Sequence, residues 1–262
     1  MLNRPERFDA DSAREQWDYN AEGWNHAQRE GLDHYRTGLH GPALVDFAGD
    51  VDGTKLLDLG CGEGYFSRQM AEQGTDVTGV DLSPNQLQYA RAREADNPLG
   101  IEYRELNASD LADEFGEESF DIVTACMSLM DMPEPERAIS AAASILRPGG
   151  RFIFNITHPC FQTPYREWHR DSDGNKIALK VGDYFKSGPI ELNFVAVSHL
   201  YDMKTTQYHA TLTQWFHWIT NAGLIVHDIH EPRPTEEAIR GHPALADAEM
   251  VAYFISFDAR KP

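Results

Sequence analysis

The chain has 262 residues, 41% of them hydrophobic, so it is long enough to bury one large core and too short for two full-sized domains. Its formal net charge of −19 disfavours nucleic-acid partners, which are held mainly by basic side chains that displace counterions from phosphates. A membrane span needs about 20 consecutive apolar residues, and the sequence offers no such run and no signal peptide, so we expect a cytoplasmic protein.

Short apolar runs alternate with helical stretches through the middle of the chain, which is typical of βαβ units. Strands are predicted over residues 55–59, 76–81, 101–106, 120–127, 151–156, 224–229 and 250–257. Helices are predicted over residues 64–73, from Pro84 after the cap residue Ser83, over 134–146 and over 212–222. An Arg-Pro-Gly-Gly sequence at residues 147–150 is interpreted as the stop of the third helix.

Two segments lie outside this alternation. Residues 1–50 precede the sheet and are predicted to be a helical cap, and residues 51–157 to form the core. The pattern lapses over residues 158–207, which are rich in aromatic, charged and turn residues and are interpreted as an insertion or lid. Residues 208–262 are expected to complete the sheet.

The turn after the first predicted strand carries three alternating glycines, in the sequence DLGCGEGY over residues 58–65. Ligands of open parallel sheets bind beyond the carboxyl ends of the strands, and glycine lets a ligand approach the main chain. A dinucleotide site would need a small residue where Tyr65 stands, and Asp58 suits a ligand with cationic groups better than a pyrophosphate. Asp81, at the end of the second strand, is placed to accept hydrogen bonds from ribose hydroxyls.

Four segments, over residues 56–71, 77–85, 120–136 and 146–154, resemble the successive motifs of class I S-adenosylmethionine-dependent methyltransferases. Residues 208–257 more weakly resemble the end of the same fold. The resemblance implies an α/β, three-layer Rossmann-like fold with a seven-stranded sheet, mostly parallel with an antiparallel last strand. It also implies S-adenosylmethionine as cofactor and S-adenosylhomocysteine as product.

The resemblance assigns cofactor contacts by position. The glycine turn is expected under the methionine part, Asp58 at the amino group, Asp81 at the ribose, and the loops after the third and fourth strands at the adenine and the methyl group. The expected contacts from the core are Asp58, Gly60, Cys61, Gly62, Gly64, Tyr65, Phe66, Asp81, Leu82, Gln86, Asn107, Ala108, Ser109, Cys126, Met127 and Ser128. Core filling is an equal alternative for Cys126 and Met127. Tyr19 resembles a tyrosine that closes over the methyl donor, with anchoring of a cap helix as the alternative.

Transfer of a methyl group from a sulfonium mainly requires alignment and exclusion of water, so a catalytic base is optional. The candidate catalytic residues are His158, at the end of the fifth strand, His209, before the helix over 212–222, and Tyr19. The alternative for His158 is a structural hydrogen bond in a tight turn. Members of the family often carry two histidines after the fourth strand, where this chain has Met130 and Asp131.

The insertion is expected to select the acceptor through an aromatic pocket. The alternative roles for its aromatic residues are a self-packed lid or a dimer contact. Its aromatic residues are Phe161, Tyr165, Trp168, Tyr184 and Phe185. We expect a small-molecule acceptor methylated on oxygen, nitrogen, sulfur or carbon, with a methylated protein as a further option. We expect a monomer or homodimer with no nucleic-acid, membrane or metal partner. The other functions considered are an NAD(P)-linked oxidoreductase and a non-catalytic, cofactor-binding partner protein.

Overall fold

A single seven-stranded sheet is the centre of the computed structural model, which describes residues 5–193 and 203–262. Its strands are β1 (Lys55–Leu59), β2 (Asp76–Asp81), β3 (Glu102–Glu105), β4 (Phe120–Cys126), β5 (Leu146–Thr157), β10 (Ile225–His230) and β11 (Phe254–Arg260). The order across the sheet is β10-β11-β5-β4-β1-β2-β3. Strands β1 to β5 pair in parallel, whereas β11 is antiparallel to both β5 and β10. The predicted fold class, including the antiparallel last strand, is confirmed.

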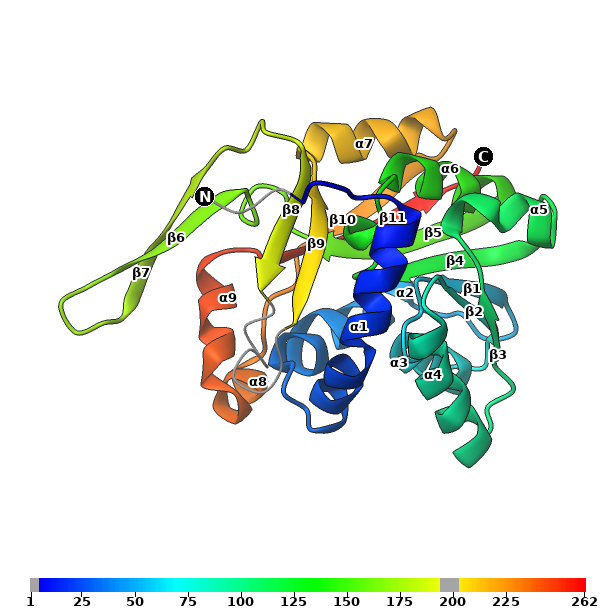
Figure 1. Ribbon diagram of the computed structural model, residues 1–262, viewed down its shortest axis with the longest axis horizontal. Coiled ribbons are helices and arrows are strands. Elements are labelled where there is room, and N and C mark those ends of the chain that lie inside the picture. Colours follow the sequence, from blue (N-terminus) through cyan, green and yellow to red (C-terminus); the bar gives the residue numbers. More distant parts are fainter. Residues whose placement is uncertain (1–4, 194–202) are drawn as a thin grey trace.

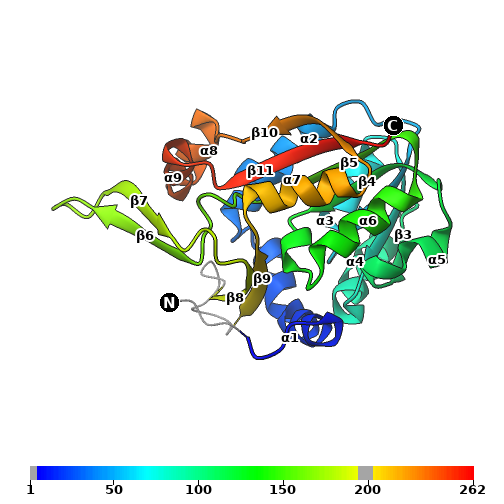
Figure 2. The ribbon, with the colours of Figure 1, turned by 90° about the horizontal axis from the view of Figure 1, so that it is seen from above.

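Helices cover both faces of the sheet and give the molecule three layers (Figures 1 and 2). They are α1 (Ala10–Arg29), α2 (Gly41–Ala48), α3 (Tyr65–Glu72), α4 (Pro84–Asp96), α5 (Leu111–Phe115), α6 (Pro135–Ile145), α7 (Leu212–Asn221), α8 (Glu236–Gly241) and α9 (Asp247–Met250). Single turns occur at η1 (Arg36–His40), η2 (Ala108–Asp110), η3 (Leu129–Asp131) and η5 (Pro243–Ala246). No helix in the described ranges is both long and apolar enough to cross a bilayer.

Two apolar clusters hold these layers together. On one face, α6 and α7 bury Ile139 and Trp215 against β4, β5 and β11. On the other face, α2, α3 and α4 bury Leu44, Phe66 and Leu87 against β1, β2, β4 and β5. Each helix thus presents one apolar face to the sheet, which is why the helical and strand periodicities alternate along the sequence.

The expected lack of regular structure over residues 158–207 is wrong for the part that the structure describes. Two ribbons occupy it, one of β6 (Tyr165–Arg170) with β7 (Lys176–Gly182) and one of β8 (Gly188–Asn193) with β9 (Lys204–His209). The β6–β7 hairpin projects away from the main sheet and is exposed along most of its length (Figures 1 and 2). Because neither of its faces is buried, its sequence lacks the alternation by which strands are recognised.

The ends of two core strands also differ from the prediction. Strand β11 begins at Phe254 and not at residue 250, because α9 occupies the preceding residues, and it continues to Arg260. Strand β5 follows α6 directly at Leu146, so the predicted helix stop lies inside β5. Strand β9 crosses the boundary predicted at residue 207, and the division of the chain into four segments stays a prediction.

Candidate functional site

A pocket of about 540 Å³, counted with its open mouth, lies beyond the carboxyl ends of β1, β2 and β3. Residues from three successive loops line it, all of them predicted as cofactor contacts: Gly60, Asp81, Leu82, Asn107, Ala108 and Ser109. The rest of the wall includes residues that the sequence did not single out: Ala10, Met132, Pro133, Glu134, Arg137 and Ala138. The pocket stands where open parallel sheets bind ligands.

Asp81 ends β2 with its carboxylate fixed by backbone donors. Oδ2 accepts a hydrogen bond from the N–H of Gly62 at 2.8 Å, and Oδ1 accepts one from the N–H of Ser83 at 2.8 Å. Burial raises the pKa of Asp81 to about 6, against the lowering effect of these two donors. Each oxygen keeps acceptor capacity, so the group suits a ligand that presents two neighbouring hydroxyls.

The glycine turn has the left-handed backbone that its sequence predicts, with φ of 71° at Gly60, 54° at Gly62 and 84° at Gly64. A Cβ on Gly60 would lie 2.5 Å from Cβ of Ser128, whereas a Cβ on Gly62 would meet nothing within 4 Å. The Ser128 hydroxyl also donates to the carbonyl of Leu59 at 2.6 Å. The end of β4 is therefore packed onto the turn, and Gly62 faces open space that a ligand can approach.

Asp58 lies beneath this turn, in the interior. Its Oδ2 accepts from the Ser67 hydroxyl at 2.6 Å and its Oδ1 from the Thr124 hydroxyl at 3.0 Å, which links β1 to α3 and β4. Burial raises the pKa of Asp58 to about 6, although both hydroxyls lower it. Phe66 is also interior, in the cluster under α2 to α4. The expected contact of Asp58 with a ligand amino group stays a prediction.

Arg36, which the sequence analysis missed, lies beside the turn. Its Nη2 donates to Oε1 of Glu63 at 2.7 Å, and its guanidinium carbon stands 4.0 Å from the centre of the Tyr65 ring. Arg93 contacts the same Glu63 oxygen at 3.3 Å. Burial alone would raise the pKa of Glu63, but both guanidinium groups outweigh it and hold the pKa below the ordinary glutamate value.

Three buried polar groups near the turn have no hydrogen-bond partner in the described ranges. They are Nη1 of Arg36, the side-chain amide of Gln86, which is 1% exposed, and the hydroxyl of Tyr103, which lies against Gly64. Buried polar groups are nearly always paired, so unpaired ones leave room for a partner from water or from a ligand. A ligand that carries a carboxylate would satisfy the arginine. Arg36 is the first residue of η1, and no sequence signal marks it.

The N-terminal helix α1 closes over the neighbouring loop. Oδ1 of Asp18 accepts from the Ser83 hydroxyl at 2.5 Å and from the N–H of Asn85 at 3.2 Å. Tyr19 itself is 75% exposed. At the end of β4, Met127 has a positive φ of 55°, and its N–H donates to Oδ1 of Asn155 at 2.8 Å. The expected cofactor contacts of Tyr19, Cys126 and Met127 stay predictions.

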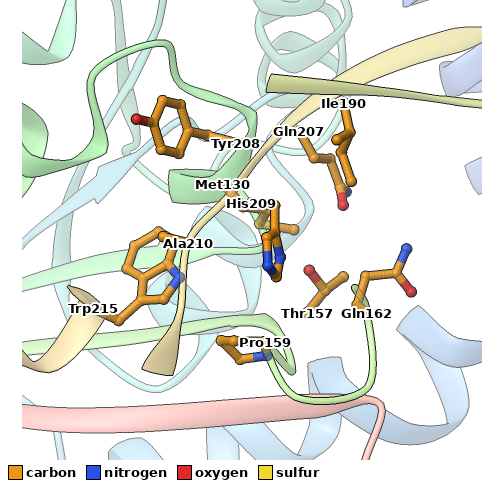
Figure 3. Close-up of a pocket in the computed structure, with 10 residues that line it drawn as sticks. All are labelled: Met130, Thr157, Pro159, Gln162, Ile190, Gln207, Tyr208, His209, Ala210 and Trp215. Carbon is orange, nitrogen blue, oxygen red and sulfur yellow. The ribbon is translucent and has the colours of Figure 1, made fainter. Parts of the chain in front are cut away.

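A second pocket, of about 260 Å³ counted with its open mouth, lies between the end of β5 and the β8–β9 ribbon (Figure 3). It is lined by Met130, Thr157, Pro159, Gln162, Ile190, Gln207, Tyr208, His209, Ala210 and Trp215. None of the five aromatic residues expected to line an acceptor pocket is among them. Two of the five, Tyr165 and Phe185, are 43% and 87% exposed. The apolar wall comes instead from β9, α7 and η3.

Both candidate histidines are engaged by the protein itself. Nδ1 of His158 accepts from the N–H of Cys160 at 3.1 Å, so the ring carries its proton on Nε2, which contacts Oε1 of Glu231 at 2.8 Å. Nε2 of His209 lies 2.8 Å from the carbonyl oxygen of Tyr184, and the ring points toward Thr157 (Figure 3). Burial lowers the pKa of both rings, against the effect of these partners.

The family model for a methyltransferase domain matches residues 57–154. The ubiquinone biosynthesis O-methyltransferase of Pseudomonas syringae pv. tomato is 37% identical over 111 residues, and that of Alkalilimnicola ehrlichii 38% over 118 residues. These matches cover 42% and 44% of the chain, and the chain spans about half of each relative, 47%.

A solved structure extends the similarity beyond this segment. The S-adenosylmethionine-dependent methyltransferase of Mesorhizobium loti is 27% identical with a TM-score of 0.71, and the alignment covers 84% of this chain and 96% of that one. The domain match, the sheet topology and this alignment agree with the motifs around the first pocket. Residues 57–154 are therefore a methyltransferase domain, and over most of its length the chain is similar in sequence and fold to an S-adenosylmethionine-dependent methyltransferase.

Proposed function

We propose that the protein binds S-adenosylmethionine in the pocket beyond β1 to β3 and transfers its methyl group to a hydroxyl of a small molecule held in the second pocket. The observation that carries this proposal is the convergence of three loops on one pocket, with Asp81 at its edge. The open space at Gly62 and the unpaired N–H of Arg36 fit the same ligand. Asp81 would hold the ribose and Arg36 the carboxylate of the methionine part.

The bound donor supplies an electrophilic methyl group on a positively charged sulfur. The residues of the chain then have three tasks, namely to orient the donor, to align the acceptor and to exclude water. Loops after β2 and β3 form the adenine side of the pocket through Leu82, Asn107 and Ala108. Met130 of η3 lines the second pocket and Met132, just after η3, lines the first, so the methyl group would be transferred where the two pockets meet beside η3.

Oxygen is the proposed acceptor atom for two reasons. The two sequence relatives named above, which the chain matches over about half of their length, are O-methyltransferases. In addition, the polar side chains lining the second pocket, Thr157, Gln162, Gln207 and His209, include no Asp, Glu, Lys or Arg. Such a wall suits a neutral ligand, because no opposite charge would offset the desolvation of a charged one.

Calorimetric titration with S-adenosylmethionine, S-adenosylhomocysteine and NAD tests the proposal. We expect micromolar binding of the first two and none of NAD. Asp81→Asn should weaken binding by at least about tenfold, since a hydrogen bond to a charged group contributes about 1.5–3 kcal/mol. The matched control is Asp76→Asn at the exposed start of the same strand, which should bind like the wild type. Binding of NAD alone, or of none of the three ligands, would overturn the proposal.

A further inference from the structure

Asp131, at the end of η3, has an unusual environment for a carboxylate. Its Oδ1 is shielded from solvent and has no hydrogen-bond partner among residues 5–193 and 203–262. The side chain of Gln207 forms a hydrogen bond with the same carboxyl group. An unpaired buried acceptor lowers the stability of the folded protein. A hydrogen-bond donor from outside the chain would remove that cost by pairing with the free oxygen.

The position of Asp131 shows where that donor would come from. Its two neighbours in sequence face different cavities, because Met130 lines the second pocket and Met132 lines the first. Its hydrogen-bond partner Gln207 also lines the second pocket. At the start of η3, Ser128 is bonded to Leu59 in the strand that leads into the glycine turn. Asp131 therefore lies between a residue that lines the proposed acceptor pocket and one that lines the proposed donor pocket.

Four other ionisable groups near the two pockets are already engaged. Asp58 accepts from two hydroxyls and Asp81 from two backbone N–H groups. The ring of His158 is held on both nitrogens, and His209 contacts the carbonyl of Tyr184. Asp131 differs from these four in having an oxygen without any partner in the described part of the chain.

We propose that Asp131 is the residue that binds the acceptor hydroxyl and accepts its proton, an inference that rests on the proposed methyl transfer. The hydroxyl donates to Oδ1 of Asp131 while its oxygen forms the new bond to the methyl carbon. The bond between that carbon and sulfur breaks, and its electron pair stays on sulfur. The hydroxyl proton passes to Asp131 and is later released to water, so charge and atoms balance.

The acceptor class follows from the acidity of the two groups. Burial raises the pKa of Asp131 well above the ordinary aspartate value, against the effect of Gln207, and a carboxylate with a raised pKa is a stronger base. It can take a proton from a phenolic hydroxyl, whose pKa is about 10 as in tyrosine, but hardly from an aliphatic alcohol, which is far less acidic. Pro159 and Trp215 give the second pocket surfaces that suit an aromatic ring. The inferred acceptor is a neutral aromatic hydroxyl compound.

The test compares Asp131→Asn with the wild type, using catechol and 4-nitrocatechol as acceptors. Catechol is protonated at slightly alkaline pH, whereas the nitro compound is largely ionised and has no need of a base. We expect Asp131→Asn to slow methylation of catechol by about 10²–10⁴-fold, and that of 4-nitrocatechol by less than about tenfold. A purely structural role would slow both equally, and that result would overturn the proposal.

Binding provides a second readout that does not depend on turnover. Catechol should bind the complex of the protein with S-adenosylhomocysteine about tenfold more weakly after Asp131→Asn, since one hydrogen bond to a carboxylate is lost. Its dimethyl ether, which has no donor, should bind both proteins alike. Exposed Asp113→Asn on α5 serves as the matched control.

The two proposals fail in different ways. If Asp131→Asn and the wild type both bind S-adenosylmethionine but neither methylates a phenolic compound, the assignment of Asp131 is overturned and the cofactor site stands. If both proteins methylate aniline or thiophenol at equal rates and neither methylates catechol, the assignment of a hydroxyl acceptor is overturned and the cofactor site again stands. Loss of S-adenosylmethionine binding by the wild type would instead overturn the proposed function itself.

Discussion

Replacing Arg36 by methionine is expected to lower the free energy of unfolding by about 3 kcal/mol. The side chains of Arg36 and Glu63 are only 9% and 2% exposed, so the substitution leaves a buried carboxylate with the longer contact to Arg93 alone. Urea unfolding followed by circular dichroism measures the loss. Because the pKa of Glu63 is depressed in the folded protein, its stabilisation is present above the ordinary glutamate pKa and disappears as the pH falls through the folded value. The deficit of the variant should therefore shrink in acid.

Arg240→Met is the matched control, because Arg240 and Glu236 form an exposed pair at 3.6 Å. Its loss should stay below about 1 kcal/mol. A ligand test separates the structural role of Arg36 from its proposed binding role. The wild type should prefer S-adenosylmethionine over the decarboxylated analogue, and Arg36→Met should lose that preference. An unchanged preference would show that Arg36 does not bind the carboxylate.

Gly60→Ala is expected to lower the free energy of unfolding by about 3 kcal/mol and to abolish tight cofactor binding. The left-handed backbone costs about 1–2 kcal/mol for a residue with a Cβ. The remainder comes from Ser128, which must move because the new Cβ would lie 2.5 Å from its own. That movement would shift η3, and with it the walls of both pockets.

Gly53→Ala is the matched control, since Gly53 has a similar φ of 69° and a Cβ there would meet nothing within 4 Å. It should show the backbone cost alone and leave binding unchanged. Thermal or urea unfolding of the two variants side by side gives the cost of the Ser128 contact as their difference. Equal losses would mean that the packing of the β4 end on the turn contributes little.

The sequence predicts best those parts of the molecule whose structure is determined locally. The glycine turn, the Ser83 cap and Asp81 at a strand end all depend on residues next to one another, and the structure brings six predicted contacts to one pocket. The core strands alternate with helices because both faces of the sheet are covered. These patterns are visible without knowledge of the tertiary structure.

What the sequence does not reveal depends on distant partners. Arg36 interacts with Glu63, and Asp131 interacts with Gln207. The two members of each pair are far apart in the sequence. The last strand was expected to end at residue 257. Asp258 is nevertheless buried, because its carboxylate pairs with Arg151 at 3.1 Å and with Arg260 at 3.0 Å. Because these paired charges interrupt the apolar pattern, the sequence does not show that β11 continues beyond residue 257.

Helix α1 touches both halves of the proposed site. On one side Asp18 is bonded to Ser83, two residues beyond Asp81. On the other side Gln16 accepts from the N–H of Thr206 at 2.7 Å, next to Gln207 in β9. One rigid element thus joins the wall of the donor pocket to the wall of the acceptor pocket. Any adjustment of α1 to one ligand changes the energy of binding the other, and thermodynamic linkage makes that effect equal in both directions. Donor and acceptor should therefore bind cooperatively, with α1 setting the size and sign of the coupling.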